Sequence, residues 1–100
     1  MDSYGMQGSQ AQAAVVAKYP NVDALISGHL HRPATAAWGG TVAFASPSTA
    51  AQVSPSFNGE GTSYTYEPGM LSLHWWTTEG IASHVRPIGD NGHWVPEWAK

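Results

Sequence analysis

The sequence predicts an α/β fold, and more narrowly a part of one, with one helix followed by about four strands. Two observations support this prediction. A helical pattern near the N-terminus leads through a short turn into an apolar strand, which is the αβ unit of α/β proteins. Further along, two strand-like segments are joined by a tight turn, as in a β-hairpin. Because a lone helix cannot cover both faces of such a sheet, we expect residues 1–100 to form a single partial domain.

The first expected element is a helix over residues 9–19, which follows a Gly- and Ser-rich loop. Ser9 is a candidate N-cap, and alanine, the best helix former, fills much of the segment. The side chains expected to share its apolar face are Ala11, Ala14, Val15 and either Lys18 or Tyr19. Pro20 and Asn21 end the helix.

The strands are expected after this helix. The short apolar run 23–27 predicts a strand of the buried type. Small residues then lead to a turn at Trp38-Gly39-Gly40. The remaining predicted strands are 41–45, 70–77 and 81–88, the last two joined at Thr78-Glu79-Gly80. The segments expected to lack regular structure are the turn 46–52, the loop 54–69 and the tail 89–100.

Composition excludes several classes of function. Charged residues make up 11% of the chain, against about 25% in a typical domain, so some of its surface is expected to be covered by other protein, such as a second copy in a homodimer. The net charge is −3 and the four basic residues are spread singly, which argues against nucleic acid as a partner. No apolar run approaches the ~20 residues of a membrane span. The lack of cysteine and of a secretory signal fits a cytoplasmic location.

The most informative stretch is VDALISGHLHRP, residues 22–33, in which two histidines follow a glycine at the end of the apolar run. In an extended backbone, His29 and His31 would point to the same side. Neutral imidazoles are good transition-metal ligands, and open α/β sheets bind ligands at the carboxyl ends of their strands. The alternative is a surface loop with two unrelated histidines.

A catalytic metal site needs at least one more protein ligand, and the sequence offers no convincing one. Asp23 lies at the opposite end of the predicted strand. His74 and His84 lie on the predicted hairpin, where surface positions are the more common interpretation. Asp90 and His93 belong to the irregular tail. The sequence therefore predicts no catalytic residue in the strict sense within this chain.

Three stretches together resemble a known family. They are YPNVDALISGHLHRP, GGTVAFASPSTAAQV, and YEPGMLSLHWW followed by GIASHVRPI. Across about residues 1–89 they look like the C-terminal third of calcineurin-like metallophosphoesterases, in the branch of the class III cyclic nucleotide phosphodiesterases. The Gly-His-x-His motif at residues 28–31 is moderately specific by itself, and the Pro-Ser-Thr-Ala-x-Gln motif that ends at Gln52 strengthens it.

The resemblance implies a four-layer α/β/β/α sandwich with two divalent metal ions, such as iron, manganese or zinc, at the strand ends. It implies that His29 binds the second metal ion and His31 the first. Two such ions, about 3.5–4 Å apart, activate water for attack on a phosphoester, here 3′,5′-cyclic AMP. The resemblance suggests Thr49 and Gln52 as substrate-binding candidates. Arg32 is a third candidate, because a guanidinium can donate charge-assisted hydrogen bonds to a phosphate, and a solvent-exposed arginine is the alternative.

The sequence departs from the family pattern in one large respect. The family's Asp-x-His, Gly-Asp, Gly-Asn-His-Asp/Glu and lone-histidine blocks are missing, and we expect them in an N-terminal segment before residue 1. The chain would then be an inactive fragment of a hydrolase. Two alternatives remain open: a stand-alone fragment that binds metal weakly or associates with another chain, and a metallophosphoesterase that acts on a phosphomonoester or a nucleotide.

Overall fold

The computed structural model describes residues 6–59 and 61–100, and it confirms the α/β class. The stretch Met1–Gly5, which by the resemblance follows the lone-histidine block, lies outside the described residues. The elements in chain order are α1 (Ser9–Val16), β1 (Ala24–Ser27), β2 (Ala34–Trp38), β3 (Thr41–Ala45), β4 (Met70–Thr77), β5 (Gly80–Pro87) and the 3-10 turn η1 (Glu97–Ala99).

The strands form two separate sheets. In the three-stranded sheet the order is β1-β3-β2, with β1 parallel and β2 antiparallel to β3. Phe44 in the central strand lies opposite Ile26 on one side and Thr35 on the other. Strands β4 and β5 form an antiparallel hairpin in which Leu73 lies opposite His84.

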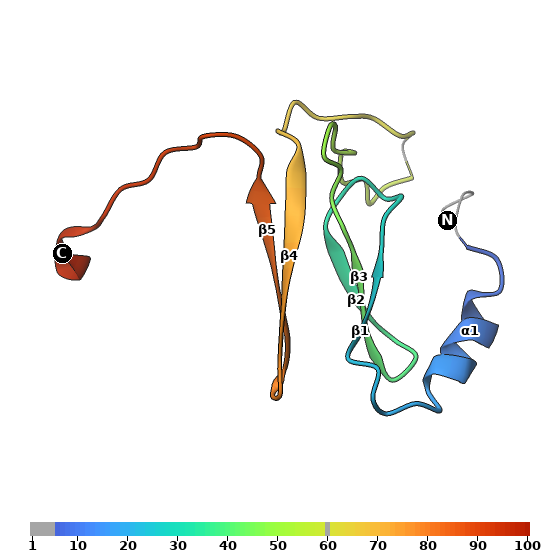
Figure 1. Ribbon diagram of the computed structural model, residues 1–100. Coiled ribbons are helices and arrows are strands. Elements are labelled where there is room, and N and C mark those ends of the chain that lie inside the picture. The colour runs from blue at the N-terminus through green and yellow to red at the C-terminus, as the bar shows by residue number, and fades with distance from the viewer. Residues whose placement is uncertain (1–5, 60) are drawn as a thin grey trace.

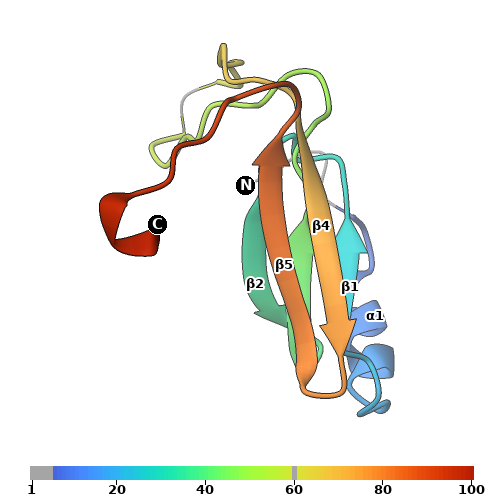
Figure 2. The ribbon, with the colours of Figure 1, turned by 60° about the vertical axis from the view of Figure 1, so that its left-hand side comes forward.

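The elements stack in three layers, with α1 on one side of the three-stranded sheet and the β4–β5 hairpin on the other (Figures 1 and 2). On the helix side, Trp38 Nε1 donates a hydrogen bond of 3.1 Å to Ser9 Oγ. On the hairpin side, the rings of Phe44 and His74 meet edge to face at 5.0 Å between centroids. Trp76 Nε1 donates to Asp23 Oδ2 at 2.5 Å. These contacts give an α/β/β arrangement.

The prediction for the helix is correct in place and wrong in two details. The helix ends at Val16, because the amides of Lys18 and Tyr19 bond to carbonyls only three residues back. Gly8, in a left-handed conformation, takes the N-cap position, so Ser9 is not the cap. The half-buried side chains are Ser9, Ala13 and Val16 rather than the predicted apolar face. The helix sequence alone does not indicate which side of the helix is half-buried, because packing against the β2–β3 turn determines it.

The predictions for the first sheet also need correction. Strand β2 was not predicted, although its link to β3 through Gly39 and Gly40 is the two-residue turn, both residues at positive φ, that favours a hairpin. Strand β1 was predicted as buried, but Ile26 is 48% exposed. An edge strand under one short helix and one hairpin has too little cover to be buried.

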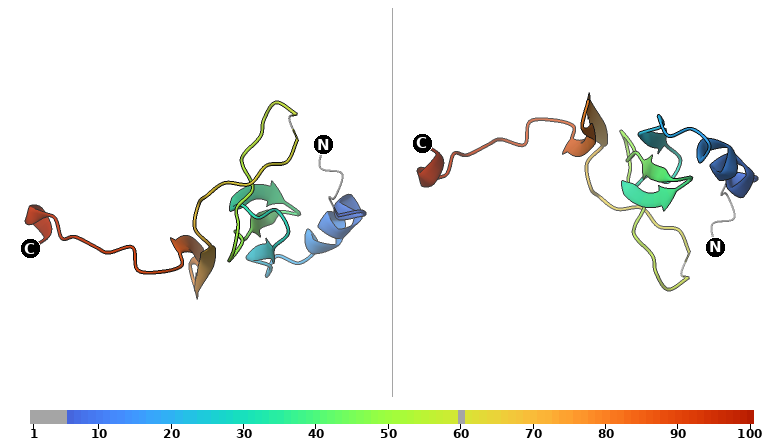
Figure 3. Two further views of the ribbon diagram at one scale, coloured as in Figure 1. Left: turned by 90° about the horizontal axis from the view of Figure 1, so that it is seen from above. Right: turned by 90° about the horizontal axis from the view of Figure 1, so that it is seen from below.

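The described core is small and lies between the two sheets and beneath the following turn. Phe44, Ala45 and Gln52 are buried there. The outer face of the hairpin, by contrast, exposes Leu71, Leu73 and Trp75. In the part of the chain that the structure describes, no helix is long and apolar enough to cross a membrane. Beyond β5 the tail runs away from the sheets (Figure 3).

Gly69 marks a close approach between the start of β4 and the turn 46–52. A Cβ atom at this position would lie 2.1 Å from the Thr49 carbonyl oxygen, closer than any real contact. We therefore expect Gly69→Ala to lower the free energy of unfolding by about 1–3 kcal/mol, as forced overpacking does. Urea denaturation measures this loss in the free energy of unfolding. Gly61→Ala is the matched control, because a Cβ there meets nothing within 4 Å, and equal losses in the two variants would contradict this account.

Candidate functional site

The candidate site is the turn 28–32, which directly follows β1 at its carboxyl end. His29 has φ of 79° and His31 has φ of 51°, so both lie in the left-handed region. The backbone is therefore not extended here, so the condition for strand-like alternation is not met and alternation does not set the directions of the two imidazoles. A left-handed conformation costs a non-glycine residue roughly 1–2 kcal/mol, so the surrounding contacts must hold this turn in place.

The two histidines differ in their surroundings. His29 is exposed, whereas His31 is half-buried and its ring meets the edge of the Tyr64 ring at 6.1 Å between centroids. His31 Nδ1 is buried and has no hydrogen-bond partner among the described residues. A buried polar atom without a partner calls for an explanation such as a bound ion. An imidazole nitrogen of this kind fits a metal ligand.

A complete metal site needs more than these two side chains. In residues 6–59 and 61–100, no group of three or more His, Cys, Asp and Glu side chains is placed to hold a metal ion. Asp23 accepts a hydrogen bond from Trp76 at the far end of β1, and His74 Nδ1 lies 2.8 Å from Ser83 Oγ on the hairpin. The described residues therefore contain no such cluster, and ligand roles for His29 and His31 stay predictions.

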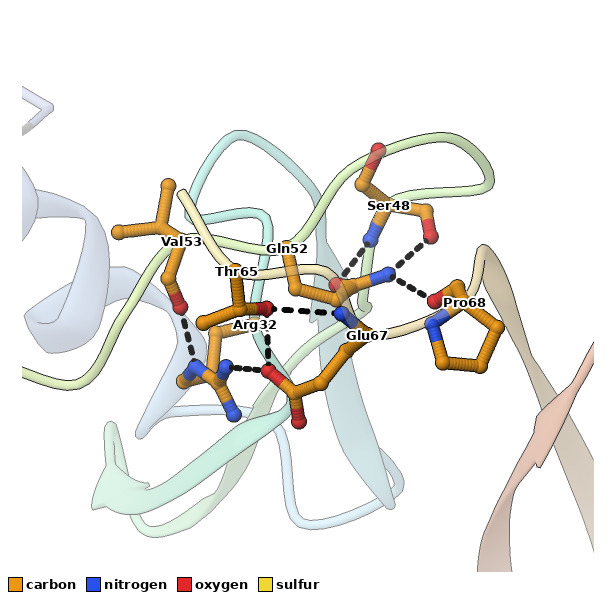
Figure 4. Close-up of polar contacts among 7 residues, drawn as sticks. All are labelled: Arg32, Ser48, Gln52, Val53, Thr65, Glu67 and Pro68. Carbon is orange, nitrogen blue, oxygen red and sulfur yellow. Dashed lines mark hydrogen bonds and ion pairs between the residues drawn. The ribbon is translucent and has the colours of Figure 1, made fainter. Parts of the chain in front are cut away.

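Arg32 ties the end of the turn to two later segments (Figure 4). Its Nε donates a hydrogen bond of 2.5 Å to the Val53 carbonyl oxygen, and its Nη2 donates to Glu67 Oε2 in an ion pair. The Val53 amide donates in turn to the His31 carbonyl oxygen at 2.9 Å. The guanidinium predicted to meet a substrate phosphate is thus engaged on Nε and Nη2 within the chain.

Gln52, another substrate-binding candidate, is fully buried. Its Oε1 accepts from the Ser48 amide at 3.0 Å, and its Nε2 donates to the carbonyl oxygens of Ser48 and Pro68 at 2.6 and 3.1 Å (Figure 4). The structure gives this amide the role of fastening the turn 46–52 to the start of β4. Thr49, the third candidate, is exposed on the same turn. A contact of any of the three with a substrate stays a prediction.

Glu67 is held as a carboxylate by its neighbours. The Thr65 hydroxyl and then the Arg32 guanidinium donate hydrogen bonds that lower the pKa of Glu67 from its ordinary value of 4.5. Because the pKa is lower in the folded chain, the ionised group stabilises the fold above pH about 4.5, and this contribution is lost as the pH falls through the lowered value.

We therefore expect the free energy of unfolding to fall more steeply below pH 4.5 in the natural chain than in Glu67→Gln, whose amide does not titrate there. Urea denaturation at a series of pH values measures the two slopes. Glu79→Gln, on the exposed hairpin turn, controls for the loss of one negative charge. Parallel curves for the natural chain and Glu67→Gln would contradict the assignment.

Sequence reasoning missed three residues around this turn. None of Glu67, Val53 and Tyr64 was singled out from the sequence. Each joins the site through a contact far along the chain: Glu67 lies 35 positions from Arg32 and Val53 lies 21. Tyr64 reaches His31 through an isolated bridge between Val53 and Tyr64. No local periodicity signals such contacts.

Comparison with known proteins points to phosphodiesterases. The chain is 33% identical over 92 residues to a protein of Arcobacter nitrofigilis described as a probable glycerophosphodiester phosphodiesterase, GpdQ, covering 89% of this chain and 34% of that protein. It is 27% identical over 88 residues to the 3′,5′-cyclic adenosine monophosphate phosphodiesterase CpdA of Haemophilus influenzae, covering 88% of this chain and 32% of that protein.

A third relative is the 3′,5′-cyclic adenosine monophosphate phosphodiesterase CpdA of Escherichia coli K12. The identity is 28% over 90 residues, which cover 90% of this chain and 32% of that protein. No family model matches the chain. The chain thus spans about a third of the length of the curated relatives it matches, and these relatives are named as phosphodiesterases.

Proposed function

We propose that this chain is part of a metal-dependent phosphodiesterase of the calcineurin-like type, in which His29 and His31 are two of the metal ligands. The observation that carries the proposal is the buried, unpartnered Nδ1 of His31 in a left-handed turn at the carboxyl end of β1. Sequence similarity to named phosphodiesterases, which extends over 88–90% of this chain, supports the proposal. The three observed layers are compatible with part of a four-layer α/β/β/α sandwich, whose fourth layer we assign to sequence outside this chain.

In the proposed site the chain provides one wall. His29 would bind the second metal ion and His31 the first, each through an imidazole nitrogen. Two divalent ions, of iron, manganese or zinc, would supply an activated water and charge stabilisation for phosphoryl transfer. The Val53 amide donates a hydrogen bond of 2.9 Å to the carbonyl oxygen of His31. The remaining ligands and the acid for the leaving group have to come from the segment that we expect before residue 1.

We propose 3′,5′-cyclic AMP as the substrate, with a glycerophosphodiester as the second candidate. Three relatives are named for cyclic AMP, whereas the relative with 33% identity is named for glycerophosphodiesters. Both candidates are phosphodiesters, so the same attack on phosphorus serves either of them. A cytoplasmic location and a homodimer stay predictions.

The test is an assay of the natural protein that contains residues 1–100 against cyclic AMP and glycerophosphocholine, with Mn²⁺ added and with chelator. We expect metal-dependent hydrolysis, faster for cyclic AMP. A preference for glycerophosphocholine would favour the second candidate. No hydrolysis of either would contradict the proposed function.

The alternative is a stand-alone chain without catalytic activity that binds metal weakly or pairs with another chain. The assay of the longer natural protein separates the two, because metal-dependent hydrolysis is expected only under the first proposal. The isolated 100-residue chain is expected to bind metal without turnover under both. Turnover by the isolated chain would show that two histidines are enough, and would contradict the need for further ligands.

A further inference from the structure

Arg32 stands at the centre of a set of contacts that the proposed function does not explain. The turn before it contains two non-glycine residues at positive φ, His29 and His31. Such conformations persist only where surrounding contacts determine them. The contacts nearest to His31 all come from segments more than twenty positions away in sequence.

Three contacts hold His31 and Arg32 to later segments of the chain. The Val53 amide donates to the His31 carbonyl oxygen at 2.9 Å, and the Val53 carbonyl oxygen accepts from Arg32 Nε at 2.5 Å. Val53 therefore holds the peptide carbonyl of His31 through its amide and the side chain of Arg32 through its carbonyl oxygen. Arg32 Nη2 reaches a second segment, where it pairs with Glu67.

The carboxylate of Glu67 is also held by Thr65, which is itself hydrogen-bonded to the backbone of Gln52. The Thr65 hydroxyl donates to Glu67 Oε2 at 2.6 Å, and the Thr65 amide donates to the Gln52 carbonyl oxygen at 2.9 Å. Gln52 is fully buried, so the series of contacts ends at the backbone of the least exposed residue of the described core. Figure 4 shows this series from Val53 through Arg32 and Glu67 to Thr65, with Gln52 beside it.

We infer that Arg32 is a positioning residue, whose guanidinium fork, fixed to Val53 and Glu67, holds His31 in the left-handed conformation that aims its imidazole for metal binding. An arginine suits this role because its Nε and Nη2 donors are rigidly spaced and serve two acceptors at once. A lysine has the same charge but only one nitrogen, so it cannot reproduce the fork. The role in metal binding rests on the proposed function, whereas the conformational role does not.

The test compares the 100-residue chain with Arg32→Lys, Glu67→Gln and the control Arg86→Lys, which makes the same exchange on exposed β5. Two quantities are measured by NMR. The intraresidue amide-to-Hα cross-relaxation of His31 is strong only at positive φ, and Zn²⁺ titration gives a dissociation constant from the imidazole resonances.

In Arg32→Lys we expect the positive-φ signal of His31 to weaken and the Zn²⁺ dissociation constant to rise by about tenfold or more, as for other residues that orient metal ligands. Glu67→Gln should change both in the same direction but less, since an amide oxygen still accepts the hydrogen bonds without the charge. Arg86→Lys should change neither.

An unchanged His31 signal in Arg32→Lys, with the sheet contacts intact, would overturn the inference. If Arg32→Lys loses the sheet contacts altogether, the positive-φ signal of His31 in Glu67→Gln tests the inference instead. Should the natural chain bind no Zn²⁺, the proposed function loses its ligands, and the His31 signal still decides whether Arg32 sets the conformation.

Discussion

Replacing Gln52 with methionine is expected to lower the free energy of unfolding by about 2–4 kcal/mol, since each unpaired buried group costs about 1–3 kcal/mol. Methionine has a similar length but cannot pair with the Ser48 amide or with the carbonyl oxygens of Ser48 and Pro68. Gln52 is 0% exposed, so water cannot replace its amide in place. A loss of this size is a large fraction of the 5–15 kcal/mol that stabilises a typical domain.

Urea denaturation of the two chains measures this difference. Gln10→Met makes the same exchange on an exposed helix position and should stay within about 0.5 kcal/mol of the natural chain. Gln52→Glu is a useful second variant, because its carboxylate can still accept from Ser48 but repels the two carbonyl oxygens. A loss in Gln52→Met no greater than in Gln10→Met would show that the amide does not fasten this turn.

The second large effect is expected at the two histidines. In the natural protein that contains this chain, His31→Ala is expected to lower kcat/KM for the phosphodiester by more than about 100-fold. Replacing a residue that merely orients a metal ligand lowers metal affinity or activity by about 10- to 100-fold, and removing the ligand itself should lower it further. His29→Ala should lower kcat/KM to a similar extent, and excess Mn²⁺ should restore part of the activity of either variant.

His93→Ala is the matched control, because that histidine lies exposed in the tail beyond β5. Hydrolysis is followed at saturating and subsaturating metal concentrations, so that weaker metal binding can be distinguished from a slower chemical reaction. Activity in His31→Ala equal to that in His93→Ala would remove His31 from the proposed site.

The local patterns of the sequence predicted most of the fold. Residues 41–45 and 70–77 were placed as strands with the bounds that β3 and β4 have. What failed depended on contacts between distant segments. Strand β2 is rich in alanine, which has little preference for strands, and its pairing with β3 across Gly39 and Gly40 determines its conformation.

The candidate site was located from the sequence but its geometry was not. The spacing of His29 and His31 after a glycine indicated a ligand site at a strand end, where the turn 28–32 indeed lies. The left-handed backbone depends on Val53 and Glu67, and no local signal links these residues to Arg32. Hydrophobic periodicity describes single elements, so it cannot reveal a turn that is held from two other segments.

The most direct test of the central claim is a Zn²⁺ titration of the 100-residue chain, followed through the imidazole resonances of its five histidines. If His29 and His31 are metal ligands, their resonances shift together and saturate with one dissociation constant, while those of His74, His84 and His93 do not move. Equal shifts in all five, or shifts confined to the other three, would contradict the assignment of His29 and His31 to a metal site.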